Sequence, residues 1–566
     1  MSVLERGGNA FDAAVAAGFT LQIVEPHLNG PGGEVPILFS KAGEDNATVL
    51  CGQGVAPAAA TIDHFQTLGL KLVPGTGLLS AVVPGAFDAW MLLLRDHGTW
   101  PLADVLAPAI HYAELGQPLL PTTADVIGRV TGLFKKEWPT SGALFLDKGR
   151  APKANALFRN PVLAETYKRL IKNASGATRE AEIESARSLW REGFIAEAID
   201  TFCRKTEAMD TSGQRHGGLL TGDDMARWSA TYESPATLEY NGTTVCKTGP
   251  WGQGPVFLQQ LALLSGFDIK AMDSLGPDFV HTVVECSKLA FADREAFYGD
   301  PNFADVPLET LLSPHYADAR RALIGREASH VLTPGQIEGY GGPIGTGDAT
   351  PQGTQDLGEF GAGEPTVAKT GETRGDTCHL DIIDRDGNMV SATPSGGWLQ
   401  GSPAIPELGF SLNTRAQMFW LDERSPSALA PGKRPRTTLT PSFVMRDGKP
   451  YMAFGTPGGD QQDQWSLTFF LRHVDHGMNL QEAIDAPAFH SEHWPNSFYP
   501  RLARHGHLVV EGRFPTQTID ALKDRGHDIT LAPDWSEGRL SACSKNGETL
   551  RAAANPRGMQ GYAVGR

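Results

Sequence analysis

Cysteine is scarce in this sequence, and its spacing excludes several kinds of site. There are only six cysteines in 566 residues, and no two of them form a C-x-x-C pair. A zinc knuckle or a thioredoxin-type redox site needs such a pair, and a disulfide scaffold needs a much higher cysteine content. We therefore expect buried free thiols, as in a protein of a reducing compartment. The positions are Cys51, Cys203, Cys246, Cys286, Cys378 and Cys543.

The sequence also lacks an excess of positive charge and a long apolar run. The formal net charge is -16 and the pI is about 5.5, so the surface repels phosphate backbones and we expect no nucleic-acid partner. No stretch approaches the roughly 18 uninterrupted apolar residues that a membrane span needs, so we expect no membrane partner either.

The first residues do not resemble a secretion signal. Residues 1–6 lack a basic segment followed by an apolar run, and they read as the end of a helix that Gly7 and Gly8 stop. As the chain stands we expect a cytoplasmic protein. A start inside a helix also indicates a truncated N-terminus, so this interpretation leaves export open.

Common catalytic signatures are missing as well. The sequence has no G-x-S-x-G elbow, no H-E-x-x-H motif and no phosphate-binding P-loop. Residues 384–387 resemble part of a calcium loop but lack its closing glutamate, so a hairpin turn is favoured. His490, Glu492 and His493 are close in sequence, but without a further ligand at defined spacing a structural role is favoured. We predict no metal and no cofactor.

Hydrophobic patterns and chain breakers predict a mixed α and β protein, too long for one ordinary core. The expected helices are 9–23, 83–117 with breaks at Pro84 and Pro101, 160–172, 180–201, 279–297, 460–473 with Asp460 as N-cap, and 479–485. The expected strands are 35–39, 243–246, 377–384, 389–393 and 449–454.

Residues 333–376 form the clearest boundary. Gly, Pro, Thr, Asp and Glu crowd together there, and the composition favours a flexible linker. The linker leads directly into the strand that opens with Thr377. A threonine in this place is usually structural. Cleavage before it, however, would create a new N-terminus whose α-amine can act as the base for its own hydroxyl.

A second candidate site is the turn at Gly458 and Gly459. It joins a predicted strand to a predicted helix start, where backbone N–H groups and the helix dipole favour an anion or a developing oxyanion. From spacing alone, this interpretation and that of a tight structural turn are about equally supported.

Several segments, in consistent order, resemble the gamma-glutamyltranspeptidase family. Residues 376–379 are similar to the family's processing site, which commonly reads Thr-Thr-His, and residues 455–459 are similar to its oxyanion-hole segment. Residues 431–441 resemble the segment that usually carries two serines, here Thr437 and Thr438. The remaining similar segments are 6–17, 24–27, 384–390, 475–479 and 482–490.

The resemblance implies a fold and a route of activation. The fold would be α+β, a four-layer αββα sandwich of N-terminal-nucleophile hydrolases. Autocleavage between Asp376 and Thr377 would give a heavy chain, residues 1–376, and a light, catalytic chain, residues 377–566. Each half needs the other to cover its sheets, so we expect the two chains to remain associated.

The resemblance also implies roles for individual residues. The Thr377 hydroxyl would attack the amide of a small molecule and form an acyl-enzyme, while the N–H groups of Gly458 and Gly459 stabilise the oxyanion. Ser395 stands where the family has a second threonine that hydrogen-bonds the nucleophile. Water or an acceptor amine would release the acyl group. The implied substrate-binding residues are Arg415, Thr437 and Thr438.

The sequence departs from the family where the substrate's amino acid would be bound. Ile62 stands in place of an arginine for the α-carboxylate, and Gly397 in place of an asparagine. Arg415 and Met418 fall near the positions of a glutamine and an aspartate that hold the α-amino group. Missing contacts of this kind can reduce selectivity by several powers of ten.

The departures leave three functions open. The main expectation is a gamma-glutamyltransferase or amide hydrolase that cleaves gamma-glutamyl or related side-chain amides. The first alternative is a cephalosporin or glutaryl acylase with little glutathione activity, in which Arg415 holds a carboxylate of the acyl group. The second, from another class, is an uncleaved inactive relative that serves as a binding protein. A metal-dependent hydrolase is disfavoured because metal ligands are few.

Overall fold

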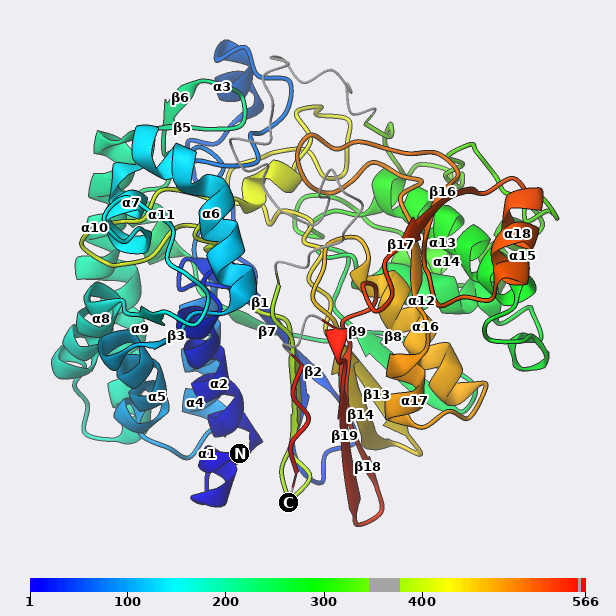
Figure 1. Ribbon diagram of the computed structural model, residues 1–566, viewed down its shortest axis with the longest axis horizontal. Helices are drawn as coiled ribbons and strands as arrows, with labels where there is room; N and C mark the ends of the chain where they lie inside the picture. Colours follow the sequence, from blue (N-terminus) through cyan, green and yellow to red (C-terminus); the bar gives the residue numbers. More distant parts are fainter. Residues whose placement is uncertain (346–376, 558–560, 566) are drawn as a thin grey trace.

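Two β-sheets pack face to face at the centre of the molecule, and helices cover the outer face of each (Figure 1). This arrangement is seen in a computed structural model, which describes residues 1–345, 377–557 and 561–565. It is the four-layer αββα sandwich that the resemblance implied, and that prediction is confirmed.

The first sheet contains strands from both sides of the predicted cleavage site. Its order is β10-β11-β1-β2-β7, and β12 also pairs with β1. All these pairs are antiparallel. The bounds are β1 Gly33–Ser40, β2 Thr48–Gly52, β7 Thr231–Glu233, β10 Leu380–Ile383, β11 Met389–Ala392 and β12 Ser395–Gly396.

The second sheet is also built from both halves of the sequence. Its order is β19-β18-β14-β13-β9-β8, and its pairs are antiparallel. The bounds are β8 Ala236–Tyr240, β9 Thr243–Lys247, β13 Ser442–Arg446, β14 Lys449–Gly455, β18 Ser541–Asn546 and β19 Thr549–Ala554.

Alternation along the strands explains how each sheet is covered on two faces. In β1, Ile37 and Phe39 join the core beneath the first group of helices, while Leu38 faces the other sheet. In β13, Val444 joins the helix-covered core and Phe443 lies between the sheets. Each strand is therefore apolar on both faces, as expected for the inner layers of a four-layer protein.

The first outer layer consists mainly of helices that precede residue 250. α2 begins after a capping box made by Asn9 and Asp12, and it ends just before Pro26. The helices on this side of Figure 1 are α1 Ser2–Glu5, α2 Ala10–Val24, α3 Ile62–Thr67, α4 Ala86–His97, α5 Leu102–Leu115, α6 Pro121–Lys136, α7 Pro139–Phe145, α8 Pro161–Asn173, α9 Arg179–Glu192, α10 Phe194–Lys205 and α11 Gly222–Arg227.

The second outer layer again combines both halves of the sequence. It includes α12 Gly254–Leu264, α13 Pro277–Phe297, α14 Leu308–Leu311, α15 Pro314–Arg321, α16 Gln462–Val474, α17 Leu480–Asp485 and α18 Thr516–Asp524. A three-stranded sheet lies on this side, with β15 Phe489–Ser491, β16 His507–Glu511 and β17 Asp528–Ala532. The short elements elsewhere are η1 Ile269–Ala271, η2 Arg415–Met418, β3 Gln117–Pro118, β4 Leu157–Phe158, β5 Glu207–Met209 and β6 Arg215–Gly217.

Most predicted elements are present, with two corrections. The helix expected over residues 180–201 is two helices, α9 and α10, separated at Gly193. Asp460 is not the N-cap of α16; Gln461 holds that position, and the Asp460 carboxylate accepts hydrogen bonds from Arg294 and Ser497 instead. All six cysteines are buried, and none of them forms a disulfide within the described residues, as expected.

The predicted linker is only partly described. Residues 333–345 contain neither helix nor strand, and residues 346–376, including Asp376, lie outside the described residues. Among the described helices, none combines the length and the apolar character that crossing a membrane requires.

Candidate active site

Thr377 lies at the start of the segment that enters β10, and it is fully buried. It forms an isolated antiparallel bridge with Ser395 of β12. The Thr377 Oγ1 and Ser395 Oγ atoms are 3.2 Å apart. The next residue, Cys378, donates its N–H to the Pro394 carbonyl at 3.0 Å, which fixes this register. The structure thus places the predicted nucleophile beside the hydroxyl predicted to bond it.

A buried ion pair lies on the other side of Ser395. Glu34 of β1 is the strand partner of Ser395, and its carboxylate accepts a hydrogen bond from Arg415 Nε. Arg415 Nη2 donates to Ser395 Oγ at 2.8 Å. A guanidinium can only donate, so the Ser395 oxygen accepts this bond and its hydrogen can be directed at Thr377 Oγ1.

Arg415 is fully buried. Its guanidinium carbon lies 4.8 Å from the ring centroid of Trp398 and 5.6 Å from that of Phe498. These two rings pack with Met418 in a small apolar cluster. We call Arg415, Trp398, Met418 and Phe498 the arginine box.

The ion pair of Arg415 and Glu34 does not use all of its hydrogen-bonding atoms. Within the described residues, Arg415 Nη1 and Glu34 Oε2 have no hydrogen-bond partner. Burial raises the pKa of Glu34, and the neighbouring Arg415 charge opposes that rise. One buried N–H group of a cation therefore remains available beside the Thr377–Ser395 pair.

Gly397, a second departure from the family, lies against a neighbouring glycine turn. Its φ is 65°, which favours glycine, and a Cβ there would come within 2.9 Å of the Gly33 nitrogen and 3.1 Å of the Gly30 carbonyl carbon. The asparagine of the family has no room at this position. The loss of that side chain and the gain of Arg415 thus occur in the same small region.

The predicted oxyanion turn follows β14. Gly458 has a φ of 123°, and its carbonyl accepts a hydrogen bond from the Gln462 side chain. The Gly459 carbonyl accepts the Gln462 backbone N–H at 3.1 Å. Within the described residues, the hydrogen bonds at this turn use the two glycine carbonyls rather than their N–H groups. Such a turn can present its N–H groups to an anion.

His379 connects the Thr377 segment to β14. Its Nδ1 is 2.9 Å from Thr393 Oγ1, and its Nε2 is 2.9 Å from Asp381 Oδ1. A Cβ on Gly455, three residues before Gly458, would lie 2.3 Å from the His379 ring. This close approach of ring and backbone links the start of β10 to the strand that leads into the glycine turn.

Thr437 and Thr438 are both fully buried. Thr437 is held by its backbone: its N–H donates to Trp251 and its carbonyl accepts from Gln253 at 2.9 Å. Thr438 Oγ1 has no partner among the described residues. Of this predicted substrate-binding pair, Thr438 is thus the one with an unused hydroxyl.

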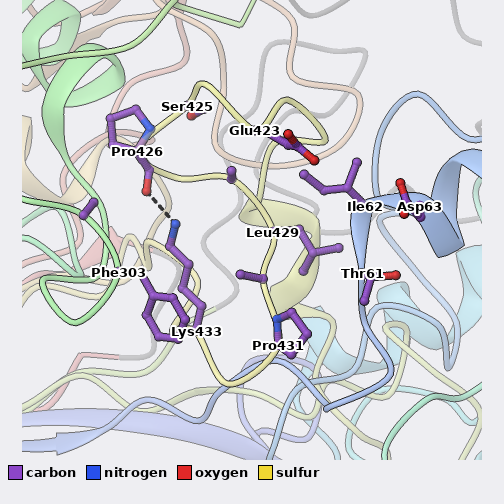
Figure 2. A pocket seen from close by; sticks show the side chains of 13 residues that line it. Thr61, Ile62, Asp63, Phe303, Glu423, Ser425, Pro426, Leu429, Pro431 and Lys433 are labelled. Carbon is purple, nitrogen blue, oxygen red and sulfur yellow. Dashed lines mark hydrogen bonds between the residues drawn. The ribbon is translucent and has the colours of Figure 1, made fainter.

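Ile62, the third departure, lies in a different place. It lines a pocket of about 380 Å3 whose walls also include Phe303, Leu429 and Pro431 (Figure 2). The ammonium of Lys433 donates to the Pro426 carbonyl at 2.7 Å. Burial lowers the pKa of Lys433 to about 8, against the opposing effect of Asp300. Asp63 and Glu423 also line the pocket, so its apolar walls carry two acidic side chains besides Lys433.

Sequence reasoning missed Glu34, Trp398 and Phe498. Glu34 did carry a signal, because it is a charged residue at the start of an otherwise apolar, fully buried strand. The two aromatic residues carried none, since Phe498 comes from a loop distant in sequence. The cluster of His490, Glu492 and His493 does not form a joint site: His490 pairs with Glu537 at 2.9 Å, and His493 Nδ1 accepts the Gly506 N–H.

Comparison with known proteins identifies the family of this chain. The model of the gamma-glutamyltranspeptidase family matches residues 1–565. The glutathione hydrolase-like YwrD proenzyme of Bacillus subtilis (strain 168) is 31% identical over 568 residues, which covers 100% of this chain and 95% of that protein.

Two solved structures are similar over almost their whole length. The structure of LmbA2991HD superposes with a TM-score of 0.93 at 56% identity and covers 100% of this chain and 96% of that one. Cephalosporin acylase from Bacillus halodurans superposes with a TM-score of 0.80 at 30% identity, over 98% of this chain and 91% of that one.

Proposed function

Because this chain belongs to the gamma-glutamyltranspeptidase family, we propose that it is a self-processing amidohydrolase or acyltransferase with Thr377 as its nucleophile. The observation that carries the proposal is the line of hydrogen bonds from Arg415 through Ser395 to Thr377. The Oγ atoms of Thr377 and Ser395 lie 3.2 Å apart, and Arg415 Nη2 is 2.8 Å from Ser395 Oγ. With Arg415 donating to Ser395, the Ser395 hydroxyl can donate its hydrogen to the Thr377 oxygen as that oxygen loses its own proton.

In the processing step, the Thr377 hydroxyl adds to the Asp376 carbonyl. The C–N bond between the two residues breaks and an ester forms between Asp376 and the threonine oxygen. Water then hydrolyses the ester, which restores the hydroxyl and leaves Thr377 with a free α-amine. Relatives of this chain are named as proenzymes, which implies two chains of one precursor that stay associated.

In turnover, the new α-amine accepts the proton of the Thr377 hydroxyl as the oxygen attacks the substrate amide. The N–H groups of Gly458 and Gly459 stabilise the resulting oxyanion. Collapse of the intermediate releases the amine product and leaves an acyl-enzyme. Water releases the acid, or an acceptor amine takes the acyl group.

The arginine box supports the acylase alternative for the substrate. Arg415 Nη1 has no partner among the described residues, so one charged donor remains for an oxygen of the acyl group. Gly397 and Met418 supply no polar group for a substrate α-amino or α-carboxylate function. We therefore propose an acyl group with a terminal oxygen acceptor, such as glutaryl, and little activity on glutathione.

The first test is the intact mass of the purified protein under denaturing conditions. The wild type should give two fragments, the smaller beginning at Thr377. T377A should remain uncut, whereas T377S, which keeps a hydroxyl, should still be cut. A single chain of about the full 60.7 kDa in the wild type would contradict self-processing and would favour the uncleaved binding protein.

The second test compares glutathione with a glutaryl amide on the processed enzyme. We expect the glutaryl amide to be cleaved at least about 100-fold faster, since unmatched polar contacts cost that much in selectivity. Equal rates would refute the acyl preference but leave Thr377 as the nucleophile.

A further inference from the structure

A group of histidines gathers around Lys288, apart from the candidate active site. His281 lies on α13, and His527 lies between α18 and β17. In Figure 1 these elements lie among the second group of helices, whereas β1, which carries Glu34 beside Ser395, is at the centre. Exposed His330 and His505 lie at the rim of the same region, because His330 packs on Gly506, the neighbour of His505.

Three side chains of this region have the arrangement of metal ligands. His281 and Glu285 are one helical turn apart on α13, so both project from the same side of the helix. The ligand atoms of His281, Glu285 and His527 all lie within 4.8 Å of one another. The three residues are only 4%, 3% and 4% exposed. His281 Nδ1 and His527 Nε2 are 2.9 Å apart.

The surroundings fix the chemical form of these ligands. His281 Nε2 is 3.0 Å from the Gly325 carbonyl, which can only accept, so Nε2 carries the hydrogen and Nδ1 presents its lone pair. Metal-binding histidines are commonly held by such a bond from the other ring nitrogen. The Ser329 N–H donates to Glu285 Oε2 at 3.2 Å. Because His281 Nδ1 accepts, His527 Nε2 donates to it in the metal-free structure, and metal binding requires the His527 hydrogen to move to His527 Nδ1, which has no partner among the described residues.

We propose that His281 Nδ1, His527 Nε2 and the Glu285 carboxylate bind a divalent transition-metal ion of the zinc type. Two imidazole nitrogens and one carboxylate are ligands that zinc accepts, and a water molecule can complete a four-coordinate site. The exposed histidines at the rim give an entering ion weak first contacts. The site goes beyond the proposed catalytic function, which does not require it.

Lys288 contacts one of the proposed metal ligands, so it gives a specific test of the proposal. Its Nζ atom lies 2.6 Å from Glu285 Oε1 and 2.8 Å from the Ser329 carbonyl, so it competes with the ion for the carboxylate. Metal binding must displace the ammonium from the carboxylate. The affinity should therefore rise when the Lys288 ammonium is removed.

The bound ion would connect two parts of the sequence. His281 and Glu285 precede residue 377, and His527 follows it. In a protein cut before Thr377, the ion would hold α13 of one chain against the loop that precedes β17 of the other.

The test is a calorimetric titration of the untagged, chelator-treated, full-length protein with ZnCl2, with metal content measured after gel filtration. We expect one tightly held zinc per chain. E285Q and H527A should weaken binding by about 100-fold or more, and K288M should strengthen it. H111A, which removes an exposed histidine elsewhere, is the matched control and should bind as the wild type does.

If H527A fails to fold, zinc binding by K288M still tests the proposal. No zinc retained by either the wild type or K288M would overturn the proposal and leave the 2.9 Å contact as a plain histidine–histidine hydrogen bond. Zinc binding that E285Q leaves unchanged would overturn it too, because the ion would then lie elsewhere. Chelation should leave self-cleavage before Thr377 unaffected, which separates this proposal from the catalytic one.

Discussion

Two fully buried arginines, Arg294 and Arg415, lie near the candidate active site and differ in how their hydrogens are used. Arg294 donates to Glu295, Asp460 and Gln253 and also reaches the Pro495 carbonyl. Arg415 donates to Glu34 and Ser395, and its Nη1 has no hydrogen-bond partner among the described residues.

The difference indicates two roles. Asp460 directly follows Gly459, so the Arg294 network anchors the turn that carries the predicted oxyanion donors. All the donors of Arg294 are engaged, as expected of a structural cation. Arg415 instead donates to Ser395, the neighbour of the proposed nucleophile Thr377, and its Nη1 has no partner among the described residues, as expected of a positioning residue that can also bind a substrate.

The largest effect should come from R294M. The substitution removes the cation between Glu295 and Asp460 and leaves two buried carboxylates short of a partner. We expect a loss of about 3–5 kcal/mol in the free energy of unfolding, measured by urea denaturation. R424A removes an exposed pair with Asp422 and should leave stability nearly unchanged. Equal losses in the two variants would contradict a structural role for Arg294.

R415M should mainly affect catalysis. It removes the donor to Ser395 and should slow self-cleavage by about 100-fold, followed as intact mass against time. It also leaves Glu34 buried without its cation. R415M/E34Q should therefore regain stability but not the cleavage rate. Recovery of the rate in the double variant would show that Arg415 acts only through folding.

S395A should have a smaller effect on the same rate. It deletes one hydrogen bond to Thr377 Oγ1, which is 3.2 Å away, and should slow cleavage by about 10-fold. S395T keeps the hydroxyl and should stay near the wild-type rate. If both variants cleave equally fast, the line from Arg415 does not extend to the nucleophile.

The smallest effect concerns His490, a buried cation that can lose its proton. Burial alone would lower the pKa of His490, but Glu537 and Glu492 outweigh it and raise the pKa to about 9. A raised pKa in the folded state stabilises the protein fully below the unfolded value near 6.5. That contribution disappears as the pH rises through about 9. Between pH 7 and 9 the melting temperature should thus fall less in H490Q than in the wild type.

Sequence reasoning predicted most helices and strands because these depend on local patterns. The hairpin of β10 and β11, the helix α2 and the strand β1 all appear close to their expected bounds. Asp460 was wrongly predicted as an N-cap. Its carboxylate is suited to capping, but it pairs with Arg294, which is distant in sequence. The break at Gly193 was missed because the apolar spacing continues across it.

The arginine box could not be predicted in the same way. Its members lie at positions 398, 415, 418 and 498, and only the folded chain brings them together. Arg415 could be selected as a departure from the family, but its burial and its contact with Ser395 required the structure. Glu34, the ion-pair partner of Arg415, did carry a signal in the sequence, because it is a lone charge in a largely apolar strand.

Both central sheets combine strands that precede residue 377 with strands that follow it, and this affects refolding. β1 pairs with β11 and β9 pairs with β13, so each sheet spans the bond before Thr377. An intact precursor folds in a reaction whose rate does not depend on protein concentration. After the bond is cut, the same native structure can be rebuilt only by a collision of two chains, each carrying open sheet edges. Heating the mature protein at high dilution should therefore be far harder to reverse than heating its T377A precursor.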